Sequence, residues 1–150
     1  KQQGTLSPQT PTVLYNAMLN PMAGYGIRGA IWYQGESNRN EADKYVRLLP
    51  GMVENWRSVW GVGEFPFYYI QIAPFDYGTH GLSSAYLREA QLKASTAIPN
   101  IGMACIMDLG EKDNIHPTLK KPVRNAWHFW HWQIPTVNQD LLTAAPYSKR

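Results

Sequence analysis

Asp113 and His116 form the pair whose residue types and spacing most resemble a catalytic dyad. They stand three residues apart in the stretch Asp-Asn-Ile-His-Pro. A carboxylate close to an imidazole fixes the tautomer of the ring and stabilises the imidazolium that forms when the ring accepts a proton. In a turn, two side chains at this spacing can reach one another. The pair is therefore a candidate general base with its orienting carboxylate, and a chance surface pair is the alternative interpretation.

Gln34 ends an apolar run and begins a polar stretch that continues to Asn38. An amide N–H at the end of a strand can donate to an oxyanion that develops in a cleft, although the same amide could simply stabilise a turn. Ser37 supplies half of the nucleophile-elbow pattern Gly-x-Ser-x-Gly, but Arg39 stands where the second glycine is needed. We therefore favour Ser37 or Asn38 as the N-cap of a following helix over Ser37 as a nucleophile.

The remaining candidates indicate neither a metal nor a cofactor. His128 and His131 could share a helix face, but a metal would need a further ligand, and packing among aromatic rings is the favoured interpretation. His80, between glycines, could line the mouth of a cleft. Cys105 is the single cysteine and lies in an apolar run, so we expect an inert core thiol and no intrachain disulfide. No Gly-rich phosphate loop is present.

Strand-like and helix-like segments alternate along the chain. Apolar runs predict strands at Ile27–Tyr33, Phe67–Ala73 and Gly102–Leu109. Apolar residues at steps of three and four predict helices at Tyr45–Trp60, Ser83–Ala97 and Leu119–Trp132. Pro50 should kink the first helix or divide it into two abutting helices, and Gly61 should end it. The segment Thr12–Met22 is apolar and is either helix or strand.

This alternation predicts an α/β fold with a parallel sheet. Ligands in such folds bind beyond the carboxyl ends of the strands, which here are Gln34–Asn38, Pro74–His80 and Asp108–His116. Three strands are few for this architecture, and Ile27–Tyr33 is too apolar for an exposed edge. We therefore expect a segment outside this sequence to pair with that strand.

Composition and charge exclude several classes of protein. The chain has 150 residues, 44% of them apolar and 17% charged, which suits at most one folded domain. The net charge of +3 forms no basic stripe, which argues against nucleic-acid binding. No apolar run reaches the roughly 18 residues of a membrane span. Residues 1–12 have the composition of a linker or loop and lack the apolar core of a signal peptide.

Aromatic side chains make up 13% of the residues. A surface rich in aromatic rings would suit carbohydrate, but large core residues are the favoured interpretation.

Three stretches together resemble the sialate O-acetylesterase group of the SGNH hydrolases. They are GAIWYQGESN (29–38), LREAQ (87–91) and DLGEKDNIHP (108–117). The resemblance implies a three-layer α/β/α, flavodoxin-like fold and hydrolysis of acetyl esters on sugars by a Ser-His-Asp triad without metal. By this resemblance residues 13–135 are the C-terminal part of such a domain, and residues 136–150 are a tail.

The resemblance also implies roles for individual residues. His116 would be the general base, Asp113 its carboxylate and Gln34 the oxyanion-hole amide, while Gly35 and Glu36 would form the turn that holds Gln34. The nucleophile of the family lies upstream in a Gly-x-Ser-Asn-like motif that this sequence lacks. We therefore expect the isolated chain to be inactive and to need the N-terminal part of the domain, or to associate with a second copy. The resemblance further implies a secreted or periplasmic protein.

Two alternatives remain open from the sequence. In the first, Ser37 is the nucleophile and catalysis lies within this chain. In the second, the chain is a non-catalytic fragment or a carbohydrate-binding module that uses its aromatic rings.

Overall fold

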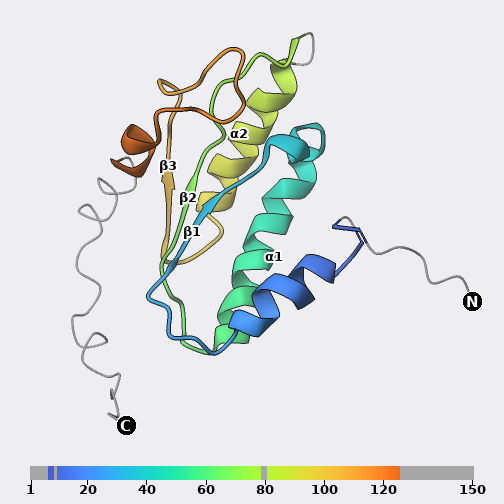
Figure 1. Ribbon diagram of the computed structural model, residues 1–150, viewed down its shortest axis with the longest axis vertical. Helices are drawn as coiled ribbons and strands as arrows, with labels where there is room; N and C mark the ends of the chain where they lie inside the picture. The colour runs from blue at the N-terminus through green and yellow to red at the C-terminus, as the bar shows by residue number, and fades with distance from the viewer. Residues whose placement is uncertain (1–6, 9, 79–80, 126–150) are drawn as a thin grey trace, which may run out of the picture.

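The computed structural model describes residues 7–8, 10–78 and 81–125. Short helical turns, longer helices and strands follow one another along this part of the chain (Figure 1). In chain order they are η1 (Tyr15–Leu19), η2 (Asn20–Met22), β1 (Ala30–Tyr33), η3 (Glu36–Glu41), α1 (Ala42–Trp60), β2 (Phe67–Ile70), α2 (Gly81–Ser95) and β3 (Ile101–Ala104). Residues 120–125 are also helical. The segment whose type the sequence left open is thus helical, and neither η1 nor η2 contains a buried residue.

The strands form one parallel sheet in the order β1-β2-β3. Phe67 of β2 pairs with Ala30 of β1 on one side and with Ile101 of β3 on the other. The predicted α/β fold with a parallel sheet is therefore confirmed. The strands are shorter than predicted, since β3 ends at Ala104 and the chain from Cys105 onward is loop.

Helices cover both faces of the sheet (Figure 1). Alternate side chains of a strand point to opposite faces. Phe67 and Tyr69 of β2 accordingly pack in the larger core with α1 and α2, whereas Ile70 packs in a second core with Val123 from the helical stretch 120–125. The beginning of the predicted third helix thus lies on the second face, and the remainder of that prediction falls outside the described residues.

The helix α1 buries Tyr45, Leu49 and Val53, which recur every four residues along one side. Pro50 lies inside this single helix, which excludes two abutting helices, one of the two alternatives that the sequence left open. Proline removes one hydrogen bond of the helix, and the buried side of α1 supplies packing on both sides of that gap. The predicted end is confirmed, because Gly61 adopts φ 64° and its N–H donates to the carbonyl of Arg57 at 3.0 Å.

Aromatic rings join α1 to the sheet. The Trp56 ring lies edge-on to Trp32 of β1, with centroids 5.6 Å apart, and 6.1 Å from the ring of Phe67. Such pairs add about 0.5–1.5 kcal/mol to the effect of area burial. These rings belong to the core, as the sequence interpretation favoured.

Two local predictions were wrong. Cys105 is exposed, because it lies just beyond the end of β3 rather than inside it. The helix α2 begins at Gly81, before the predicted start at Ser83. Among the helices of the described ranges, none is long and apolar enough to cross a lipid bilayer.

β1 is an edge strand. In the part of the chain that the structure describes, β2 is the only strand that pairs with it. Ile31 of β1 points to the second face of the sheet and keeps 62% of its surface exposed.

Candidate active site

The carboxyl ends of the three parallel strands meet at one edge of the sheet (Figure 1). Gln34 directly follows β1, and His116 lies in the loop that follows β3. Because β2 lies between β1 and β3, and neighbouring strands are about 4.8 Å apart, the ends of β1 and β3 are separated by roughly 10 Å.

The side chain of Gln34 is held on both sides of its amide. Its Nε2 donates to Oδ1 of Asn38 at 2.7 Å, and its Oε1 accepts from the Tyr45 hydroxyl at 3.4 Å. The same hydroxyl donates to the backbone carbonyl of Gln34 at 3.1 Å. One N–H of the amide is therefore used within the turn, while the other has no partner in the described part of the chain and can serve a ligand.

Gly35 lets the chain turn sharply after Gln34. Its φ is +151°, and a Cβ at this position would lie 3.1 Å from Ile72 Cγ2 and from Leu87 Cδ2. A side chain here would therefore crowd Ile72 and Leu87, and it would also strain the backbone, because residues other than glycine rarely adopt this φ. Gly35 fixes the direction in which Gln34 leaves the strand.

Gln91 of α2 holds this turn through hydrogen bonds from its side chain. It is fully buried, its Nε2 donates to the Gln34 carbonyl at 3.3 Å, and its Oε1 accepts from the Ile72 N–H at 3.0 Å. The Tyr69 hydroxyl donates to the Gln91 carbonyl. Gln91 thus joins the ends of β1 and β2 to α2. The sequence analysis included Gln91 only in a predicted helix and in the stretch LREAQ, and an amide beside apolar positions was the signal that could have indicated this further role.

The loop that carries His116 is braced by Glu111. The Glu111 carboxylate accepts from the Thr118 N–H at 2.5 Å, from its hydroxyl at 2.6 Å and from Asn114 Nδ2 at 3.2 Å. Asn114 in turn accepts from the His116 N–H at 3.0 Å. The hydroxyl and then the N–H of Thr118 hold the pKa of Glu111 below its usual value, and Asn114 acts in the same direction.

The loop is also tied to the loop after β2. The Asp76 N–H donates to the Lys112 carbonyl at 3.1 Å, and the Lys112 ammonium lies 3.9 Å from the Asp76 carboxylate. A Cβ on Gly110 would lie 2.6 Å from Pro74 Cδ, so the two loops touch through backbone at this point. These contacts fix the base of the loop and leave its tip exposed.

Asp113 and His116 lie at that tip, and both are exposed. Among the described residues, no hydrogen bond or ion pair joins the two side chains. Their common loop keeps them close in the chain, but the carboxylate that braces the loop is that of Glu111. The sequence interpretation did not single out Glu111, and nothing in the spacing alone favoured it over Asp113.

A charged and aromatic cluster lies beside Gln34. The Arg39 guanidinium is over the Tyr77 ring, 4.2 Å from its centroid, and Arg39 Nη1 donates to the Glu36 carbonyl at 3.1 Å. Burial, followed by the charge of Glu36, raises the pKa of both Tyr33 and Tyr77. Both phenols therefore stay protonated at neutral pH.

Comparison with known proteins decides the family. Residues 4–129 match the family described as carbohydrate esterase, sialic acid-specific acetylesterase. The chain belongs to this family. It is 29% identical to the sialate O-acetylesterase of Rattus norvegicus and 31% identical to that of Homo sapiens.

Each of these alignments covers 95% of the chain, but only 30% and 31% of the respective relative. The crystal structure of a carbohydrate acetylesterase from Xanthomonas citri is similar with a TM-score of 0.72 and 40% identity, over 78% of this chain and 28% of that one. This acetylesterase-family chain therefore spans about a third or less of the length of the relatives it matches.

Other sequence candidates have less support in this member of the acetylesterase family. Ser37 and Asn38 lie inside η3, whose N-cap is Gly35, so the interpretation of either residue as a helix cap was wrong. Within the described ranges, no three His, Cys, Asp or Glu side chains cluster as metal ligands. His80, His128 and His131 lie outside the described residues.

Proposed function

We propose that the protein to which this chain belongs is a serine esterase that removes O-acetyl groups from sugars of the sialate or xylan type. The observation that carries the proposal is that a chain of the acetylesterase family brings Gln34 and the His116 loop to one edge of its sheet. The nucleophilic serine would come from a segment outside this sequence. Export to the periplasm or the medium is part of the proposal and follows from the family resemblance.

The first half-reaction would transfer the acetyl group to the serine. His116 accepts the hydroxyl proton while the oxygen attacks the acetyl carbonyl carbon. The free N–H of Gln34, together with backbone N–H groups, stabilises the negative oxygen of the tetrahedral intermediate. Collapse of the intermediate breaks the bond to the sugar oxygen, which takes the proton from His116 and leaves as the free sugar.

The second half-reaction would release acetate. A water molecule gives a proton to His116 and attacks the carbonyl carbon of the acetyl-serine, and the same groups stabilise the oxyanion again. The intermediate then collapses: the bond from the carbonyl carbon to the serine oxygen breaks, the serine oxygen takes the proton back from His116, and acetate leaves. Asp113 would orient the imidazole once its exposed side chain turns toward His116 in the complete site. Catalytic hydrogen bonds of this kind are often loose before substrate binds.

Replacing the base tests this assignment. In the protein with its complete domain, His116→Ala should lower the kcat/KM for p-nitrophenyl acetate by about 10⁴-fold, because loss of a triad member has an effect of that size. Lys120→Ala is the matched control, since this exposed neighbour lies outside the proposed chemistry and should keep the rate. Full activity of the His116 variant would refute the role of this residue.

Chemical labelling separates the proposal from the alternative in which Ser37 attacks. Ser37 is exposed in η3, and among the described residues no hydrogen bond joins its hydroxyl to an imidazole. A fluorophosphonate probe should modify a serine of the upstream segment, as read by mass spectrometry of the digested protein. An adduct on Ser37 would instead place the nucleophile in this chain.

A further inference from the structure

Asn38 is the side chain that the Gln34 carboxamide meets within its own turn. Gln34 directly follows β1, and its Nε2 donates to Asn38 Oδ1 at 2.7 Å. Asn38 lies inside η3 and caps no helix. Among the residues that the structure describes, Gln34 is the only hydrogen-bond partner of its side chain. The contact with Gln34 is therefore what this side chain does in the fold.

The backbone between the two residues holds them against one another. The Asn38 N–H donates to the Gly35 carbonyl at 2.7 Å, which closes a tight turn directly after Gln34. Gly35 permits this turn, because its φ of +151° is one that other residues rarely adopt. The side chains of Gln34 and Asn38, four positions apart, are thus brought together by main-chain geometry.

The orientation of a carboxamide decides what it can do for a ligand. Its N–H groups stabilise a negative oxygen, whereas its carbonyl oxygen would repel that oxygen. Asn38 Oδ1 can only accept a hydrogen bond, so it pairs with Nε2 of Gln34 and not with Oε1. The bond to Asn38 thus fixes which end of the Gln34 carboxamide is which, and it leaves the second N–H for a ligand.

Tyr45 supports this orientation less strongly than Asn38. Its hydroxyl has a single hydrogen, and the main-chain carbonyl of Gln34 at 3.1 Å is a nearer acceptor than Oε1 at 3.4 Å. Burial raises the pKa of Tyr45, so the hydroxyl remains a donor at neutral pH. Because a bond of 3.4 Å is long for a hydroxyl donor, Asn38 is the main determinant of how the Gln34 amide is oriented.

We propose that Asn38 is a positioning residue, which orients the Gln34 carboxamide so that its second N–H stabilises the oxyanion of ester cleavage. The inference rests on the proposed function, because it gives Asn38 a part in the same reaction. In this role Asn38 touches neither the ester nor the serine. Its whole effect on the rate passes through Gln34, and an experiment can isolate that property.

A double-mutant cycle in the protein with its complete domain tests the inference. Asn38→Ala should lower kcat for p-nitrophenyl acetate by about tenfold and leave KM nearly unchanged, because the oriented N–H acts only when the oxyanion forms. Gln34→Ala removes the donor itself and should lower kcat by roughly 10²–10³-fold. In the Gln34→Ala background, Asn38→Ala should have no further effect, since no carboxamide is left to orient.

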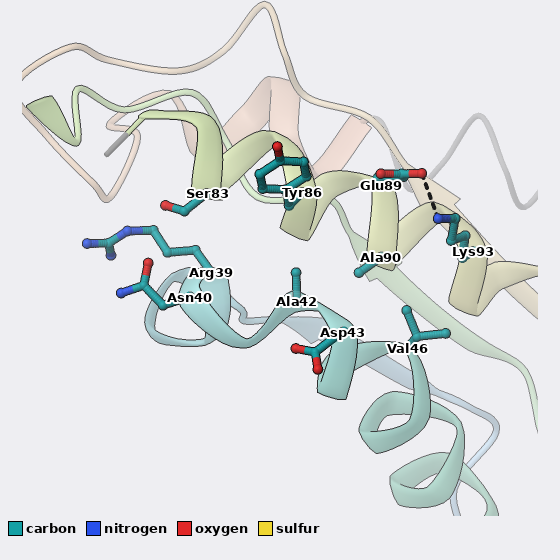
Figure 2. A pocket seen from close by; sticks show the side chains of 10 residues that line it. All are labelled: Arg39, Asn40, Ala42, Asp43, Val46, Ser83, Tyr86, Glu89, Ala90 and Lys93. Atoms are coloured by element: carbon teal, nitrogen blue, oxygen red, sulfur yellow. Dashed lines mark ion pairs between the residues drawn. The ribbon is translucent and has the colours of Figure 1, made fainter. Parts of the chain in front are cut away.

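Two further variants separate the hydrogen bond from packing and folding. Asn38→Leu has a similar volume without the acceptor oxygen, and it should lose as much kcat as Asn38→Ala. Asn40→Ala is the matched control in η3. Asn40 is exposed, lines the groove between η3 and α2 (Figure 2), and its side chain has no hydrogen bond with a described residue. Its kcat should equal that of the parent.

Three results would overturn the inference. Asn38→Ala could lower kcat by the same factor with and without Gln34, its effect could fall on KM alone, or Asn38→Leu could keep the parent rate. The first would show that Asn38 acts independently of the amide, and the last that its volume matters and its oxygen does not. A Gln34→Ala variant with full kcat would instead contradict the proposed function itself, and the inference with it.

Discussion

At the scale of single residues, Gln91 connects two strand ends at the candidate site. Its one side chain serves the Ile72 N–H and the Gln34 carbonyl, which belong to different strand ends. Both partners are main-chain groups that secondary structure leaves unpaired at this edge. Replacing this buried amide with an apolar side chain would leave the Ile72 N–H without a partner, whereas the Gln34 carbonyl would keep its hydrogen bond from the Tyr45 hydroxyl.

We therefore predict that Gln91→Leu destabilises the protein by about 1–3 kcal/mol, the cost of leaving one buried donor without a partner. Urea unfolding followed by circular dichroism measures the change. The reciprocal exchange Leu92→Gln, at the neighbouring exposed position, is the control and should stay within about 0.5 kcal/mol of the parent. A Gln91 variant as stable as the control would show that the hydrogen bonds of the Gln91 side chain contribute nothing to the free energy of unfolding.

The carboxylate of Glu111 gives a prediction about pH. Its pKa is lowered in the folded protein, so its stabilising bonds are fully present above the unfolded value of about 4.3 and are lost as the pH falls through the folded pKa. At pH 7, Glu111→Gln should lower the melting temperature relative to the parent. The two melting temperatures should converge as the pH falls through the folded pKa of Glu111.

Glu54→Gln is the control for this comparison, because Glu54 is exposed on α1 and makes no ion pair or hydrogen bond with a described residue. Its melting temperature should follow that of the parent at every pH. A difference between parent and Glu111→Gln that persisted unchanged at low pH would mean that the carboxylate charge is not what braces the loop.

The sequence located Gln34 because an apolar run visibly ends there. It could not reveal the partner of this residue, since Gln91 lies 57 positions away and meets it only when α2 packs on the sheet. Nor could it reveal Glu111, because Asp113 has the same charge and a closer spacing to His116. Donors converge on Glu111 only after the loop closes.

At the scale of elements, Gly110 joins two loops. A Cβ at Gly110 would lie 2.6 Å from Cδ and 2.7 Å from Cβ of Pro74, where only backbone and a rigid ring can give way. Gly110→Ala should therefore push the His116 loop from the loop after β2 and destabilise the protein by about 1–3 kcal/mol. In the complete domain, acetylesterase activity should fall as well, because the loop carries the proposed base.

A second glycine provides the contrast. Gly51 lies in α1, and a Cβ at this position would meet no atom within 4 Å beyond its own stretch of helix. Gly51→Ala should therefore stabilise the protein by up to about 1 kcal/mol through helix propensity. Thermal unfolding measures both variants: the melting temperature should fall for Gly110→Ala and rise for Gly51→Ala. Equal effects of the two substitutions would mean that the loops can separate freely.

The order of the elements follows from periodicity, and their ends do not. The spacing of apolar residues from Tyr45 onward predicted the buried side of α1. Packing of that side stabilises the helix on both sides of Pro50, so the helix continues past the proline. The third apolar run gave no sign that pairing stops at Ala104. The run continues because Ile106 is buried in the second core, outside any strand.

At the scale of the whole molecule, the outer edge of β1 is the feature that most needs a partner. Its backbone groups on that side have no strand to pair with among the described residues, and Ile31 is exposed on the second face. An unpaired apolar edge strand is a template for association. In the relatives, most of the protein lies outside the part that this chain matches.

We predict that the 150-residue chain alone self-associates as its concentration rises, and that Ile31→Lys suppresses this association. Light scattering coupled to size-exclusion chromatography measures the mass, and Leu92→Lys, an exposed leucine changed on α2, is the control that should leave association unchanged. In the complete protein, Ile31→Lys should instead be harmful and lower the stability. A segment that covers β1 would bury an unpaired lysine there, which costs considerable free energy. Two outcomes would contradict this prediction: the isolated chain stays monomeric at every concentration, or Ile31→Lys leaves the complete protein as stable as before. Either outcome would show that the outer edge of β1 is exposed to solvent in the complete protein.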